Sequence, residues 1–198
     1  MTKEKNSMKG SSGQNPANRA TLSGVHDYFV SNVLPDDIQV HIRQIKAPTS
    51  YANNQDETFI LVRSGTGKAI INGLEYALRP NTLMNLGPFH RYRYIPAKGT
   101  QLEIAEARMN SGTYMYMIAN PYLKSEQFSV PSEPPVIHLS GLWADIANES
   151  MNGLLAEMHN KSSDKIQICF CYMMDFIGII TDAMPKGYFS NPKKPQTP

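Results

Sequence analysis

The chain has few cysteines: only Cys169 and Cys171 occur among its 198 residues. They are two positions apart in an apolar segment. A helix there would point the two side chains about 200° apart, which disfavours a disulfide between them. A metal site would need more nearby ligands than this segment offers. We therefore expect two small buried thiols in a reducing compartment.

The sequence also lacks a strong charge of either sign and a long hydrophobic run. Its formal net charge of +2 is too small to indicate nucleic-acid binding by charge alone. The first twenty residues are polar and contain no apolar stretch of a secretion signal. The longest apolar run, QICFCYMMDFIGII, is interrupted by Asp175. We expect a cytoplasmic globular protein, since 41% of its residues are hydrophobic.

Short strands are indicated between about Asp37 and Arg108. The segment IQVHIRQI alternates apolar and polar residues, and TFILVRSGTGKAIINGLEYAL predicts three strands separated by a glycine-rich turn and an Asn72-Gly73 hairpin. RPNTLMNLGPFHRYRYI adds two strands, and TQLEIAEARM adds another. Six or more short strands joined by tight turns predict a closed or double-sheet β architecture.

The pattern changes to helical after a proline-rich segment. Apolar spacing predicts one helix over residues 140–159, with Ser140 as its N-cap, and a second helix that Ser163 and Asp164 could cap. The expected organisation is a flexible N-terminal arm (1–20), a β-barrel (21–130), a proline linker with a helical hairpin (131–184) and a second linker (185–198).

The apolar face of this hairpin is wider than a single neighbour would normally cover, which favours dimerisation. The alternative is that both helices pack on the barrel and on each other. The predicted dimerisation residues are Trp143, Leu154, Phe170, Met173, Phe176, Ile177 and Ile180.

The run DETFILVRSGTGKAIINGLEYALRPNTLMNLGPFHRYRY resembles the N-terminal cupin-like domain of AraC-family transcription regulators. PVIHLSGLWADIANESMNGLL is similar to the helical segment that follows this domain. The resemblance covers roughly residues 38–184. It implies a mainly β fold, a cupin-like double-stranded β-helix or jelly-roll barrel, followed by an antiparallel helical hairpin. Where many members have Pro-Gly-Asp, this chain has Pro80-Asn81-Thr82, and asparagine tolerates the left-handed turn conformation.

The same resemblance implies the ligand-sensing and dimerising half of a regulator. Family members carry about a hundred further residues with two helix-turn-helix units, and DNA binding would belong to such a domain beyond Pro198. The alternative is a stand-alone metal-free cupin that binds a small molecule. The gene sequence beyond Pro198 discriminates between the two.

A catalytic metal is disfavoured, and no cofactor is expected. Enzymatic cupins hold iron, manganese or nickel through a His-x-His pair, a following Glu and a later His. SYANNQDETFILVRSGTG, where the first ligands should lie, contains no histidine. His90 stands at the position of the later single histidine, and one imidazole cannot hold such a metal. No nucleophile motif is present either, so we expect a binding protein rather than an enzyme.

The segment GPFHRYRY contains the candidate ligand-binding residues. Strand alternation points His90, Tyr92 and Tyr94 to one face and the two arginines to the other. The split disfavours a nucleic-acid surface, which needs both residue types on one exposed face. Residues from this stretch bind the effector in family members such as the arabinose-sensing regulator, which implies that role for His90 and Tyr92. Tyr94 and Glu106 are further candidates, and a purely structural role remains open for each residue.

Overall fold

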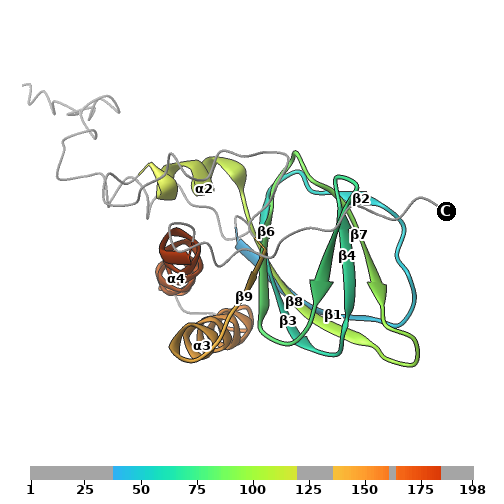
Figure 1. Cartoon of the computed structure of the whole chain (residues 1–198). Coiled ribbons are helices and arrows are strands. Elements are labelled where there is room, and N and C mark those ends of the chain that lie inside the picture. The colour runs from blue at the N-terminus through green and yellow to red at the C-terminus, as the bar shows by residue number, and fades with distance from the viewer. Residues whose placement is uncertain (1–37, 120–135, 161–163, 184–198) are drawn as a thin grey trace, which may run out of the picture. The chain divides into compact units, whose positions relative to one another are not determined.

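The computed structural model describes residues 38–119, 136–160 and 164–183, which form two antiparallel sheets and three helices (Figure 1). The five-stranded sheet has the order β1 (Ile38–Ile45), β8 (Leu102–Met109), β3 (Glu57–Ser64), β6 (Thr82–Leu86) and β9 (Val136–His138). The four-stranded sheet has the order β2 (Ala52–Asn53), β7 (Arg91–Pro96), β4 (Gly67–Ile71) and β5 (Leu74–Leu78). The helices are α2 (Ser111–Ile118), α3 (Leu142–Glu157) and α4 (Lys165–Ala183).

Two apolar cores cover the two faces of the five-stranded sheet. One core lies between the sheets and contains Ile60, Met84 and Ile104. The other lies between this sheet and the helices and contains Phe59 and Phe176, whose rings stack with centroids 5.5 Å apart. Neighbouring residues of β3 therefore face different cores, which explains why the strand is apolar at nearly every position. This arrangement confirms the predicted jelly-roll barrel followed by helices.

The predicted turns form as their residues require. Asn72 and Gly73 both have positive φ angles, 48° and 84°, and join β4 to β5 in the tight hairpin predicted from the sequence. Asn81 has a φ of 64°, so asparagine does adopt the left-handed conformation between β5 and β6.

Several local predictions are corrected. Ser140 is not the N-cap of α3: Gly141, with a φ of 54°, takes that position and makes no side-chain cap. Cys169 is buried as expected, but Cys171 is exposed. Helix α2 was not predicted; Asn110 begins it by accepting a hydrogen bond from the Gly112 amide at 2.8 Å.

The boundary between barrel and hairpin also differs from the prediction. Val136–His138 was assigned to the proline linker, yet it forms β9 and pairs with β6 in the five-stranded sheet. The predicted arm (1–20), the prolines at 131, 134 and 135, Ser163 and the second linker (185–198) lie outside the described residues.

The seven predicted dimerisation residues have two different environments. Trp143 is 36% exposed and Phe170 is half-buried. The other five are fully buried within this chain, in the core between the helices and the five-stranded sheet: Leu154, Met173, Phe176, Ile177 and Ile180. Their contacts with the barrel and with each other account for their apolar character within one chain. Dimerisation itself stays a prediction.

No helix among the described residues combines the length and the apolar character needed to cross a membrane.

Candidate functional site

The alternation predicted for HRYRY is confirmed. Tyr92 and Tyr94 are 6% and 1% exposed, and His90 is also buried. Arg91 is exposed and Arg93 is half-buried on the opposite face of β7. The two tyrosines therefore point between the sheets, where their ring centroids lie 5.5 Å apart.

Glu106 lies in the same interior. It is on β8, on the face that Leu102 and Ile104 turn toward the four-stranded sheet, and it is 5% exposed. Its carboxylate accepts from Arg43 Nη1 at 2.9 Å and lies 2.8 Å from His41 Nε2. Both partners come from the edge strand β1, where His41 is directly opposite Glu106. The buried carboxylate is thus held by two side chains that reach solvent, those of Arg43 and His41.

A hydrogen-bond network anchors Tyr92. Its hydroxyl donates to Asn54 Oδ1 at 2.8 Å, while Asn54 Nδ2 donates to Thr58 Oγ1 and to the Leu86 carbonyl. Burial, with the nearby Glu106 charge, raises the pKa of the Tyr92 phenol, so this hydroxyl remains a donor at neutral pH.

The Tyr94 hydroxyl has no hydrogen-bond partner among the described residues, although it is buried. Burial raises the pKa of this phenol well above its ordinary value, and the charge of Glu106 raises it further. An unsatisfied buried hydroxyl is costly, and buried polar groups in native structures generally have partners. Tyr94 therefore presents a donor aimed into the interior, beside the Glu106–Arg43 ion pair.

His90 has a structural task that the sequence did not reveal. Its Nδ1 accepts from the Gly87 amide at 2.9 Å, and its own amide donates to the Gly87 carbonyl at 3.1 Å. The imidazole thereby closes the turn that precedes β7, and Nδ1 is occupied. Its role as a ligand-binding residue stays a prediction.

The structure brings Tyr92, Tyr94 and Glu106 together and adds residues that sequence reasoning missed. Arg43, His41 and Asn54 come from segments far away in the sequence. The one available signal was the polar alternation of IQVHIRQI, which places His41 and Arg43 on one face of β1. Only the pairing of β1 with β8 shows that this face meets Glu106.

A second polar group lies on the helical side of the five-stranded sheet. Asn85 is 5% exposed, and its Nδ2 donates to the Tyr114 hydroxyl at 3.0 Å. Glu57 packs against the backbone at Gly87. Burial, followed by the charge of Asp56, raises the pKa of Glu57 to about 7. Glu57 therefore titrates near neutrality.

Stability is expected to fall as the pH rises from about 4.5 to about 7, because the folded state holds the Glu57 proton longer than the unfolded chain. Glu57→Gln keeps the shape and cannot ionise, so the variant should match the wild type below pH 4.5 and exceed it above pH 7. Urea unfolding at several pH values measures this difference. The exposed Glu149→Gln controls for net charge. A constant offset between Glu57→Gln and the wild type at every pH would contradict the prediction.

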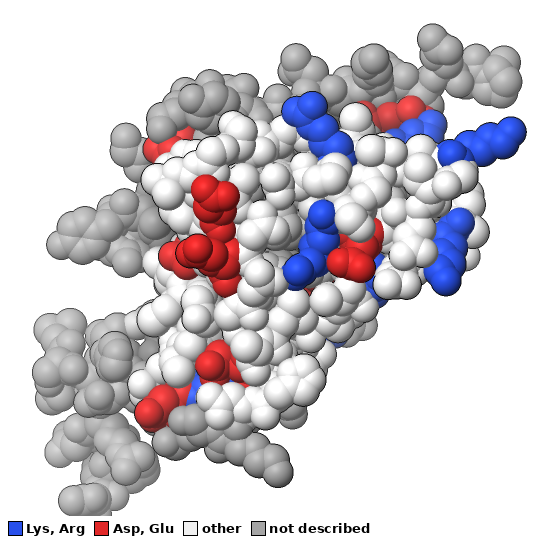
Figure 2. All heavy atoms as spheres, turned by 90° about the horizontal axis from the view of Figure 1, so that it is seen from below, with Lys and Arg blue, Asp and Glu red and all other residues white. Residues whose placement is uncertain are grey.

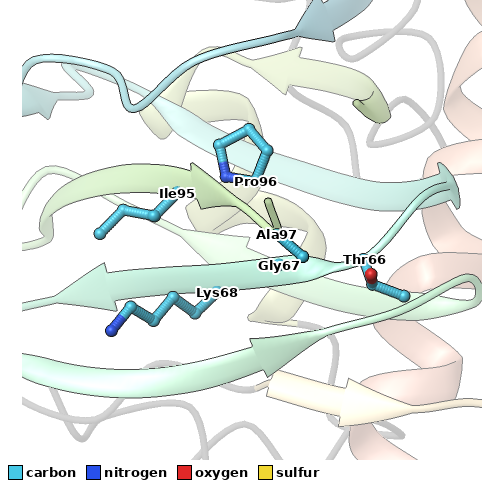
Figure 3. Close-up of a pocket in the computed structure, with 6 residues that line it drawn as sticks. All are labelled: Thr66, Gly67, Lys68, Ile95, Pro96 and Ala97. Carbon is cyan, nitrogen blue, oxygen red and sulfur yellow. The ribbon is translucent and has the colours of Figure 1, made fainter. Parts of the chain in front are cut away.

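A surface pocket of about 310 Å³ lies away from these residues, at the ends of β4 and β7. Figure 3 shows Lys68 and Ile95 extending from neighbouring strands on one side of it. Lys68 Nζ is already paired with Glu75 at 2.7 Å. None of the four predicted ligand-binding residues lines this pocket.

Charges of both signs share the surface in view in Figure 2, with acidic side chains mostly on the helical side and basic ones mostly on the barrel side. Within residues 38–119, 136–160 and 164–183, no three histidine, cysteine, aspartate or glutamate side chains lie close enough to hold a metal ion.

No protein-family model and no curated protein matches the sequence. Solved structures of ToxT from Vibrio cholerae, an AraC-family regulator, do match the fold. An apo form is 10% identical over 81% of this chain and 60% of ToxT, with a TM-score of 0.54. A form bound to an unsaturated fatty acid is 14% identical over 78% of this chain and 56% of ToxT, with a TM-score of 0.50.

A cupin protein from Bacteroides fragilis is 18% identical over 38% of this chain and 68% of that protein, with a TM-score of 0.36. The chain spans less than two thirds of the length of ToxT in both matches above. The polar interior described above therefore belongs to a fold that the chain shares with ToxT, a cupin-like barrel followed by helices.

Proposed function

We propose that this chain is the ligand-sensing and dimerisation region of a cytoplasmic AraC-type transcription regulator. A small molecule would bind between the two sheets, and DNA would be bound by a helix-turn-helix domain beyond residue 198. The chain would act by binding rather than by catalysis. The likeness to ToxT over 78–81% of the chain supports this reading, since fatty-acid-bound and apo forms of ToxT share the fold.

The observation that carries the proposal is the buried Tyr94 hydroxyl. It has no partner among the described residues and lies in an interior that also contains the Glu106–Arg43 ion pair. One part of this interior is polar, and the rest is an apolar core that includes Ile60, Met84 and Ile104. A site of this composition fits a small amphipathic molecule with an acceptor for Tyr94.

Ligand screening by thermal shift, with Tyr94→Phe as the diagnostic variant, tests the proposal. A ligand present at 100 times its Kd should stabilise the wild type by about 2.7 kcal/mol. Tyr94→Phe should fold at least as stably as the wild type, because it loses a buried unpaired hydroxyl, and should bind the ligand roughly fivefold more weakly.

Tyr116→Phe on the surface of α2 is the matched control and should bind like the wild type. Equal affinity of all three proteins would remove Tyr94 from the site. A gene that ends at residue 198 without a helix-turn-helix pattern would instead favour the stand-alone metal-free cupin.

A further inference from the structure

Two arginines and a tyrosine gather on the outer face of the four-stranded sheet. The guanidinium carbons of Arg91 and Arg93 lie 4.6 Å and 4.8 Å from the centroid of the same ring, that of Tyr51. Tyr51 is 42% exposed, Arg91 is exposed and Arg93 is half-buried. The three side chains, named here the Arg-Tyr-Arg cluster, form one accessible group on the opposite face of β7 from Tyr92 and Tyr94.

The fold holds Tyr51 firmly in this position. The Thr49 amide donates to the Tyr94 carbonyl, and Thr49 Oγ1 accepts from the Tyr94 amide, both at 2.9 Å. On the other side of Tyr51, β2 pairs with β7, with Ala52 opposite Tyr92. The segment that carries the ring is therefore fixed to the strand that carries both arginines. Little ordering remains to be done when a ligand binds.

Both arginines lack an acidic partner among the described residues. By contrast, four lysine and arginine side chains there are paired with a carboxylate, namely Arg43, Arg63, Lys68 and Arg108. Arg93 Nε is also buried and makes no hydrogen bond within the described part of the chain. Two like charges over one ring, one of them with an unsatisfied donor, are unfavourable without a counter-charge.

The geometry points to a binding site for a phosphate group, separate from the ligand site between the sheets. A guanidinium that stacks on a ring uses its flat face, and its two terminal nitrogens can make bidentate bonds to an oxyanion. Both guanidinium carbons lie within 5 Å of one centroid, and in the proposed site one anion contacts both. A phosphate monoester carries about −1.5 to −2 charges and three free oxygens, which matches two arginines better than a single carboxylate does.

The Arg-Tyr-Arg cluster combines basic and aromatic side chains on one face, as nucleic-acid-binding surfaces do. Strand alternation separates the arginines from Tyr92 and Tyr94, but Tyr51 supplies an aromatic ring on the arginine side. Because the arginines already lie over that ring, a nucleobase would have to displace them before stacking. The available groups are two cations, and a phosphate offers them the negative charge that a neutral base lacks.

Titration calorimetry with inorganic phosphate and with glycerol phosphate, at constant ionic strength and pH 7.5, tests this inference. Both should bind the wild-type chain, whereas acetate should not. Arg91→Gln/Arg93→Gln should weaken phosphate binding at least about tenfold, because it removes both positively charged guanidinium groups. Lys46→Gln/Lys98→Gln removes two exposed charges elsewhere and should leave the Kd within about twofold.

Nuclear magnetic resonance of the wild type gives a readout that does not depend on the variants folding. The Arg93 Nε–H signal should shift on phosphate addition and not on acetate addition. An unmoved signal, or an equal loss of phosphate binding in the lysine control, would overturn the inference. So would a duplex oligonucleotide that binds through the two arginines when neither phosphate nor glycerol phosphate does.

Discussion

Phe176→Ala is expected to lower the free energy of unfolding by about 3–5 kcal/mol, the usual cost of removing a buried phenylalanine. Phe176 is fully buried and stacks on Phe59 of β3, so its ring joins α4 to the barrel. The lost ring contacts and the cavity left behind both contribute to this cost. Chemical denaturation of the two proteins under identical conditions measures it.

Phe89→Ala provides the matched control, because Phe89 is 70% exposed and should cost no more than about 0.5 kcal/mol. Repeating the measurement over a hundredfold range of protein concentration separates a core residue from a dimer residue. A contact within one chain gives the same loss of unfolding free energy at every protein concentration. A contact between two chains gives a loss that changes with protein concentration. A concentration-dependent loss would place Phe176 in a dimer interface.

Gly65→Ala is expected to lower the free energy of unfolding by about 2–5 kcal/mol. Gly65 lies between β3 and β4, where the chain crosses from the five-stranded sheet to the four-stranded sheet, and its φ is 82°. A Cβ there would overlap the carbonyl oxygen of Gln101, which is backbone and cannot rotate away. The cost combines an unfavourable φ with displacement of the segment that enters β8.

Gly73→Ala separates these two contributions. Gly73 has nearly the same φ, 84°, but a Cβ at that position would meet no atom within 4 Å. Its cost should be about 1–2 kcal/mol, that of the left-handed conformation alone. Thermal unfolding of both variants gives the comparison. If the two alanine variants are equally stable, the close approach of Gln101 does not constrain the barrel.

The sequence predicted the strands well because their signals are local. Alternation in HRYRY, the Asn72-Gly73 hairpin and the left-handed Asn81 depend on residues next to each other in the chain, and each prediction is confirmed. The strand β9 gave no such signal. It has only three residues, and it is a strand only because β6 offers it a partner.

The candidate site was predictable in part for the same reason. Tyr92 and Tyr94 follow from one strand's alternation, but Arg43 reaches Glu106 across 63 residues of sequence. The same holds for Phe176, which was predicted to take part in dimerisation and is buried against β3 within one chain. The width of an apolar face shows how much area is covered, not whether the covering group belongs to the same chain.

Strand β3 contacts both the interior of the barrel and the helices. Ile60 faces the interior between the sheets, and its neighbour Phe59 touches Phe176 on α4. Close-packed side chains transmit displacement rather than absorb it. A molecule that displaced Ile60 would therefore be expected to displace Phe59 and its contact with Phe176 as well. Because β3 contributes to both cores, a change inside the barrel would reach the helices through two neighbouring residues of one strand.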